Sequence, residues 1–191
     1  KENLIKKIMQ SKLIEKIKFQ KKIPIIGKGS SLEISNNFTR LIKEDFEVIE
    51  ITLRSHDALD TARSMKEQYP NAIIGIGSIK SLKVLKQVSS YNFDFYVSPG
   101  INRHLLEFSN KNKLNYIPGV STPSEIMTAI EYDYSILKFF HAERSGGVQS
   151  LKFLFEVFDN IKFLPTGGIT SKNFESYLDL PNVLSVGSTG F

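Results

Sequence analysis

The sequence predicts an α/β protein built as a closed (β/α)8 barrel, the TIM-barrel architecture. Short apolar segments alternate with amphipathic helical segments along the 191 residues, and about eight of the apolar segments have strand length. Glycine, proline and hydroxyl residues directly follow most of these strands, which is where such barrels carry their active sites. Two strands also carry charged side chains, Glu50 and Lys138, at positions that a barrel would bury. We therefore expect one barrel domain over residues 1–191.

The composition excludes several classes of function. There is no cysteine, so disulfides, thiolate metal sites and a cysteine nucleophile are ruled out. The three histidines, His56, His104 and His141, lack the spacing of a metal site, so we expect no metal. The net charge of +5 is spread along the chain apart from a lysine-richer N-terminal segment, which favours a solvated surface or an anionic substrate over nucleic acid. No apolar run is long enough to cross a bilayer, so we expect a cytoplasmic protein without membrane association.

The first half of the chain alternates helices and strands. Leucines and isoleucines at helical spacing among lysines predict a helix over residues 1 to about 18, which we expect to cap one end of the barrel. Ser30 and Glu33 have the capping-box spacing that begins a helix, and Pro70 ends a later one. The expected strands cover residues 22–27, 46–54 and 72–76, and the expected helices cover 30–43, 57–69 and 81–88.

The second half repeats this alternation. Thr122, Pro123 and Glu125 supply a helix cap, a first-turn proline and a capping-box glutamate. The expected strands cover residues 93–97, 114–117, 135–143, 161–164 and 183–186, and further helices cover 148–158 and 173–178. A helix normally follows the last strand of a barrel, so we expect that helix to be missing from a sequence that stops at Phe191.

A single lysine, Lys138, interrupts an otherwise apolar strand. Side chains alternate along a strand, so Ile136, Lys138 and Phe140 point to one face while Leu137 and Phe139 point to the other. Because both faces are apolar, we expect a strand buried on both sides. A buried amine loses its proton more readily than one in water, and a neutral amine can attack a carbonyl. The alternative is a lysine whose stem lies on apolar surface while its head reaches water.

A second strand, over residues 46–54, has one polar face. Its two sets of side chains are Ile49, Ile51 and Leu53 on one face and Glu50, Thr52 and Arg54 on the other. A half-exposed antiparallel strand would show the same alternation. In a closed parallel barrel, the polar face would instead be the interior, where charges are costly and are kept mainly for chemistry.

Two glycine-rich strand ends, Gly167-Gly168 and Gly187-Ser188, stand at the seventh and eighth strand positions. Barrels often bind a phosphate with backbone N–H groups of these two loops, and glycine permits the close approach. The alternative is that the glycines only form tight turns. A dinucleotide site is not indicated, because no Gly-x-Gly-x-x-Gly follows the first strand.

Seven short motifs follow one another from about residue 22 to the end of the chain. They are residues 49–54 (IEITLR), 75–78 (GIGS), 98–100 (SPG), 117–122 (IPGVST), 138–143 (KFFHAE), 165–169 (PTGGI) and 186–188 (VGS). In this order they resemble the 2-keto-3-deoxy-6-phosphogluconate (KDPG) aldolases, also called 4-hydroxy-2-oxoglutarate (KHG) aldolases. The resemblance implies a homotrimeric class I aldolase of the Entner–Doudoroff route that needs no metal or other cofactor.

The resemblance also implies a role for each unusual strand-end residue. Lys138 would form a Schiff base with a 2-keto acid, and Glu50 would act as general acid and base. Arg54 and Ser78 would hold the pyruvyl carboxylate, and Thr166 would help to set stereochemistry. Pro99 and Phe140 would contact the substrate as well. The implied phosphate site consists of Gly167, Gly168, Gly187 and Ser188. The implied substrates are thus a 2-keto acid and a phosphorylated sugar acid.

Two positions depart from the family's usual pattern. Ser78 stands where the family usually has threonine, which keeps the hydroxyl and loses a methyl. His141 stands where the family usually has proline, which frees the backbone and adds a titratable ring near the barrel mouth. We interpret His141 as a tolerated loop residue.

Two alternatives to this function stay open. An aldolase for the galactonate epimer would share the lysine and the glutamate. We associate that enzyme with an asparagine after the proline of the fourth strand end and a valine in place of Thr166, which this sequence does not have. A non-catalytic phosphate-binding barrel would not form an imine with pyruvate.

Overall fold

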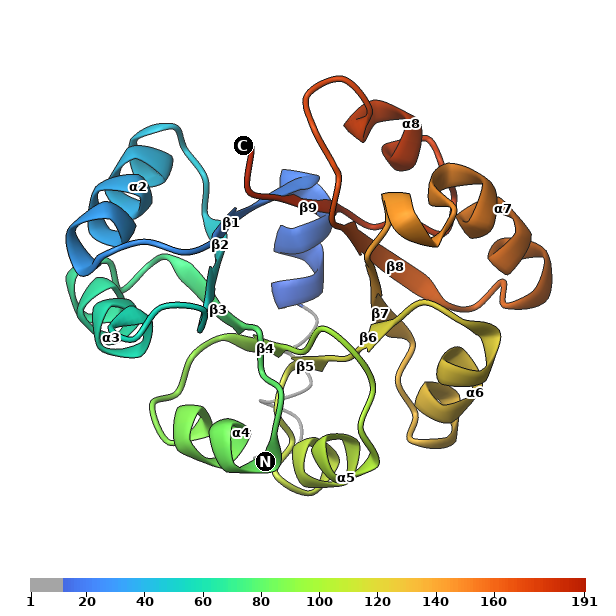
Figure 1. Ribbon diagram of the computed structural model, residues 1–191, viewed down its shortest axis with the longest axis horizontal. Coiled ribbons are helices and arrows are strands. Elements are labelled where there is room, and N and C mark those ends of the chain that lie inside the picture. Colours follow the sequence, from blue (N-terminus) through green and yellow to red (C-terminus); the bar gives the residue numbers. More distant parts are fainter. Residues whose placement is uncertain (1–11) are drawn as a thin grey trace.

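The computed structural model describes residues 12–191, and its parallel strands form a ring that helices surround on the outside (Figure 1). In chain order, the strands are β1 (Lys22–Ile26), β2 (Val48–Thr52), β3 (Ile73–Gly77), β4 (Phe95–Val97), β5 (Tyr116–Ile117), β6 (Gly119–Val120), β7 (Ile136–Phe140), β8 (Lys162–Thr166) and β9 (Val186–Ser188). The helices are α2 (Ser31–Lys43), α3 (Ala58–Gln68), α4 (Leu82–Ser89), α5 (Arg103–Lys111), α6 (Pro123–Glu131), the 3-10 helix η1 (Glu143–Ser145), α7 (Gly147–Val157) and α8 (Phe174–Leu178). Residues 12–20 are helical as well.

The strands pair in parallel in the order β5-β4-β3-β2-β1-β9-β8-β7-β6. β5 and β6 are consecutive pieces of one barrel strand, interrupted at Pro118, with β5 paired to β4 and β6 paired to β7. Proline has no N–H to donate, but the Pro118 carbonyl accepts the N–H of Lys138 at 2.9 Å. The two ends of the sheet order, β5 and β6, thus belong to one barrel strand, and this strand closes the ring. The closed ring confirms the predicted (β/α)8 barrel.

Several predicted boundaries are confirmed by side-chain caps. The Ser30 hydroxyl accepts the N–H of Glu33, and the Glu33 carboxylate accepts the N–H of Ser30, so both arms of the capping box are present. Thr122 and Glu125 make the same reciprocal pair at the start of α6. Each pair satisfies N–H groups that the first turn of a helix leaves without partners.

One helix, α5, was not predicted. It begins after Asn102, whose side chain accepts the N–H of His104, and it buries Leu105 and Leu106. Asn102 is a favoured N-cap residue and could have marked this start. With α5 included, a helix follows each barrel strand from β1 to β8.

The last strand begins later than predicted. The sequence predicts a strand over residues 183–186, whereas β9 covers Val186–Ser188. Val183 makes only an isolated bridge to Phe163, while the register with β1 joins Lys22 to Val186 and Pro24 to Ser188. Pairing with a strand that is distant in sequence therefore decides this boundary, and local composition does not.

The barrel interior is closed at the amino-terminal ends of the strands by the helix over residues 12–20. Leu13 and Ile17 of this helix are buried in one cluster with interior side chains of the strands. Those side chains are Ile23, Val48, Phe95, Val97, Ile117 and Leu164. Figure 1 shows the helix, in blue, across the centre of the ring. The predicted capping helix is confirmed for its described part, and residues 1–11 lie outside the described residues.

Among residues 12–191, no helix combines the length and the apolar character that a bilayer span requires.

Candidate active site

Lys138 and Glu50 meet inside the barrel. Lys138 lies in the middle of β7 and Glu50 in the middle of β2, and their residues are 5% and 4% exposed. Lys138 Nζ lies 3.2 Å from Glu50 Oε1 and 3.5 Å from Oε2. Leu137 and Phe139 are buried in one cluster with Leu151 and Leu154 of α7, whereas Ile136 packs against the interior cluster, so the predicted face alternation of β7 is confirmed. Burying a pair of charges has a large desolvation penalty, so a catalytic role explains the pair better than a contribution to stability does.

Two glycines of β3 make room for interior side chains. A Cβ atom on Gly77 would lie 1.9 Å from Glu50 Oε1, so the Glu50 carboxylate occupies the space that any other residue at position 77 would fill. A Cβ on Gly75 would lie 2.1 Å from the ring of Phe95. The sequence motif contained both glycines, but their role in seating Glu50 and Phe95 follows only from the packing.

A small cavity adjoins the Lys138 amine. The residues that line it are Ile23, Glu50, Phe95, Val97, Ile117, Lys138, Leu164, Thr166 and Gly187. Thr166 is buried, and its hydroxyl lies 3.3 Å from the Leu164 carbonyl oxygen. The Lys138 amine also lies 5.4 Å from the centre of the Phe140 ring. The structure thus brings together five sequence-predicted residues: Lys138, Glu50, Thr166, Gly187 and Phe140.

Arg54 and Ser78 lie at the barrel mouth. The Arg54 side chain comes from the end of β2, and its Nε donates to the Ser78 hydroxyl at 3.2 Å. Arg54 is exposed, and Ser78 has a left-handed backbone with φ of 64°. Neither residue lines the small cavity at Lys138, and Pro99 does not line it either. Arg54, Ser78 and Pro99 instead follow the carboxyl ends of β2, β3 and β4.

The loop after β8 exposes backbone donors. Gly167 and Gly168 both have positive φ, 98° and 78°, a conformation that glycine adopts without strain. Within residues 12–191, neither glycine donates its N–H to another group of the chain. The Ser188 hydroxyl donates to the Ile169 carbonyl at 2.6 Å, which ties the end of β9 to this loop. Gly187 faces Thr166 across the strand pair.

Three residues beside this loop had no predicted role in binding. The His141 ring packs against Gly167, and Glu143 packs against Gly168. The Tyr177 hydroxyl donates a hydrogen bond to the Glu143 carboxylate. Burial, together with this hydrogen bond, raises the pKa of Tyr177. No sequence pattern links Tyr177 to the site, because the contact spans 34 residues.

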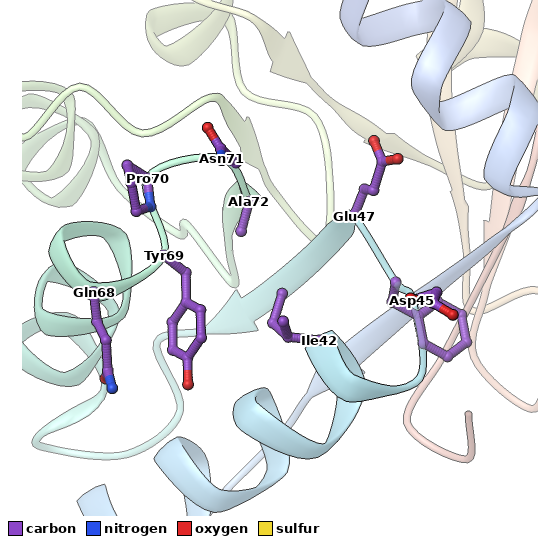
Figure 2. A pocket seen from close by; sticks show the side chains of 9 residues that line it. Ile42, Asp45, Glu47, Gln68, Tyr69, Pro70, Asn71 and Ala72 are labelled. Carbon is purple, nitrogen blue, oxygen red and sulfur yellow. The ribbon is translucent and has the colours of Figure 1, made fainter.

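The larger pockets lie away from Lys138. One of about 420 Å³ is lined by Ile42, Asp45, Phe46, Glu47, Gln68, Tyr69, Pro70, Asn71 and Ala72 (Figure 2). Glu47 directly precedes β2 and Ala72 precedes β3, so this pocket is at the amino-terminal ends of the strands. Barrels of this architecture carry their chemistry at the opposite end, where Lys138, Arg54 and the glycine loops are found.

Within the described residues, no group of three or more histidine, aspartate or glutamate side chains is arranged to hold a metal ion. The acidic and basic groups of the site instead suit chemistry by proton transfer and by a nucleophilic amine.

Comparisons with known proteins agree with this geometry. A family model described as KDPG and KHG aldolase matches residues 13–191. The chain is 42% identical over 149 residues to 2-dehydro-3-deoxy-phosphogluconate aldolase of Pseudoalteromonas atlantica, a match that covers 78% of this chain and 69% of that protein. It is 36% identical over 149 residues to KHG/KDPG aldolase of Escherichia coli, covering 78% of this chain and 70% of that protein.

A solved structure of KDPG aldolase from Legionella pneumophila, with pyruvate captured as a covalent carbinolamine intermediate, superposes with a TM-score of 0.85. Its sequence is 35% identical, and the match covers 88% of this chain and 82% of that chain. The family model and these relatives together show that the chain belongs to the KDPG and KHG aldolase family.

Proposed function

We propose that this chain is a class I aldolase that cleaves KDPG to pyruvate and glyceraldehyde 3-phosphate. KHG, which yields pyruvate and glyoxylate, is the second proposed substrate. The observation that carries the proposal is the buried Lys138 amine, 3.2 Å from the Glu50 carboxylate inside the barrel. An amine next to a proton acceptor is the minimum equipment for making an imine with a ketone.

Lys138 and Glu50 divide the chemistry between them. Glu50 takes a proton from the Lys138 ammonium, and the free amine attacks the C2 ketone to form a carbinolamine. Loss of water, with a proton supplied by Glu50, leaves a protonated imine. Glu50 then takes the proton of the C4 hydroxyl, and the electrons of the C3–C4 bond move into the imine as the aldehyde leaves. Protonation of the resulting enamine at C3 and hydrolysis release pyruvate and restore Lys138.

The residues at the mouth orient the substrate. Arg54 presents a guanidinium fork to the substrate carboxylate, and Ser78, which Arg54 contacts, adds a hydroxyl. Pro99 and Phe140 supply apolar contact surface to the carbon chain. The N–H groups of Gly167 and Gly168 have no acceptor within residues 12–191, and we assign them to the phosphate together with backbone N–H groups at Gly187 and Ser188. Because both ends of the substrate are held, the C3–C4 bond keeps a fixed orientation relative to the imine.

We further propose that the chain forms one barrel domain and works as a homotrimer in the cytoplasm, as the sequence resemblance implies. Four exposed apolar side chains, Met127 and Ile130 on α6 and Phe153 and Val157 on α7, offer surface for contact between subunits. Light scattering coupled to gel filtration tests this assembly, and a monomer at micromolar concentration would contradict it.

Trapping with borohydride tests the proposed function. Pyruvate plus borohydride is expected to add one reduced pyruvyl group, at Lys138, and Lys138→Ala is expected to lose both the adduct and the turnover of KDPG. The matched control is Lys162→Ala, because Lys162 lies on the neighbouring strand and its exposed amine donates to the Pro181 carbonyl. An adduct on a different lysine would disprove the assignment, and a protein with no adduct at all would favour a non-catalytic phosphate-binding barrel.

A further inference from the structure

His141 lies directly beside the two glycines of the loop after β8. A Cβ atom placed on Gly167 would lie 2.7 Å from Cγ and Cδ2 of His141 and 2.9 Å from Nε2. A Cβ placed on Gly168 would lie 3.5 Å from Cε1 of the same ring. The ring therefore spans both glycines, and its Nε2 edge is on the Gly167 side.

The hydrogen bonding of the ring indicates where its proton resides. His141 Nδ1 is buried and has no hydrogen-bond partner among the described residues. A neutral imidazole has one N–H donor and one lone-pair acceptor. An unpaired buried donor is rarer in proteins than an unpaired buried acceptor, so Nδ1 is assigned the lone pair and Nε2 the proton. His141 then presents its Nε2–H as a donor beside Gly167.

Three possible donors belong to residues that pack together at this loop. The backbone N–H groups of Gly167 and Gly168 have no acceptor within residues 12–191, and the His141 ring, with Nε2, packs against Gly167. The Glu143 side chain packs against Gly168, and its carboxylate already accepts a hydrogen bond from Tyr177 of α8. A cluster of donors of this kind matches a phosphate group, which offers several acceptor oxygens.

We propose that His141 Nε2–H donates a hydrogen bond to the phosphate of the bound sugar acid and thereby strengthens this enzyme's preference for phosphorylated over unphosphorylated 2-keto acids. The assignment rests on the proposed function. A proline at this position, as the resembling family usually has, offers no side-chain donor. The histidine therefore adds a specificity contact and is more than a tolerated loop residue.

Steady-state kinetics with two substrates separates this contact from a structural role. His141→Phe keeps a ring but removes the donor, and it is expected to lower kcat/KM for KDPG by about 10-fold or more, mainly through KM. The same variant is expected to leave kcat/KM for KHG within about 2-fold, because KHG has no phosphate. His141→Gln can place an amide N–H near the Nε2 position, and it is expected to restore most of the KDPG activity. His141→Pro serves as a second donor-free variant if His141→Phe does not fold.

Inhibition by inorganic phosphate gives an independent readout. Phosphate is expected to compete with KDPG in the parent protein and in His141→Gln, and to compete about 10-fold more weakly in His141→Phe. Borohydride trapping of pyruvate on Lys138 is expected to be equal in all of these proteins, so a failure of the proposed function would be seen separately. Equal losses on KDPG and KHG, or loss in His141→Gln as large as in His141→Phe, would overturn the proposal.

Discussion

Lys138 Nζ and Glu50 Oε1 lie 3.2 Å apart although 88 positions separate the two residues in the chain. The contact crosses the interior of the barrel, because β1, β9 and β8 lie between β2 and β7 in the sheet order. Only closure of the ring brings the two side chains together. The distance is short enough for direct proton transfer from the amine to the carboxylate.

Replacement of Glu50 by glutamine tests its role as proton acceptor. Glu50→Gln keeps the shape and the volume of the side chain but removes the base, so kcat for KDPG is expected to fall by about 10²–10⁴-fold. Thermal unfolding of the variant serves as the control for folding. Turnover near the parent value would mean that another group carries the proton.

Gly77 is expected to be essential for the position of Glu50. In Gly77→Ala, the new Cβ would lie 1.9 Å from Glu50 Oε1, so the carboxylate has to leave its place beside Lys138. We expect kcat to fall by at least about 10-fold, since misplacement of a catalytic group by about 1 Å has effects of this size or more. The matched control is Gly27→Ala, whose Cβ would approach nothing closer than 3.7 Å. Similar kinetics in the two variants would refute this role.

Arg54 is expected to contribute to the affinity for both KDPG and KHG. Arg54→Ala removes the guanidinium that we assign to the carboxylate, which KDPG and KHG share, so KM is expected to rise by about 10-fold or more for both. Arg63→Ala is the control, because Arg63 pairs with Asp60 on the exposed side of α3. A loss confined to KDPG would instead place Arg54 at the phosphate.

Thr166 is expected to control stereochemistry at low cost in stability. Its hydroxyl makes one long hydrogen bond, 3.3 Å to the Leu164 carbonyl, so Thr166→Val removes little that supports the fold. The variant is expected to lose discrimination between the C4 epimers of KDPG while keeping the pyruvate adduct. The ratio of the two kcat/KM values measures this, and an unchanged ratio would place the control of stereochemistry elsewhere.

Stability is expected to decline above about pH 10, the ordinary pKa of a tyrosine in an unfolded chain. Burial raises the pKa of Tyr96 to about 12, and burial also raises the pKa of Tyr116. Between the unfolded and folded pKa values, the unfolded chain has lost these protons and the folded chain retains them, so the free energy of unfolding falls as pH rises. Urea unfolding from pH 8 to 11 measures the decline. In Tyr116→Phe, the free energy of unfolding is expected to fall less steeply with pH. A fall as steep as in the parent protein would show that Tyr116 does not contribute to it.

The sequence by itself determined the local parts of this structure. Apolar periodicity identified the strands of the barrel, and the Ser30 and Thr122 capping boxes marked two helix starts that the structure confirms. These signals are local, because a strand's face alternation and a helix cap depend on residues within a few positions of one another. The strand patterns alone left the burial of Lys138 and Glu50 open, and it followed only once the strands were expected to close into a barrel.

Only the tertiary structure decided which distant residues meet. The β9 register, the space that Gly77 leaves for Glu50, and the placement of His141 against Gly167 all depend on pairs of segments that are far apart in the chain. Such contacts follow from closing the barrel, where the register of each strand is set by its neighbours on both sides. A pattern within one segment does not show which distant segments pack against it. The sequence alone therefore left His141 as a loop residue. It also did not reveal the contact between Tyr177 and Glu143.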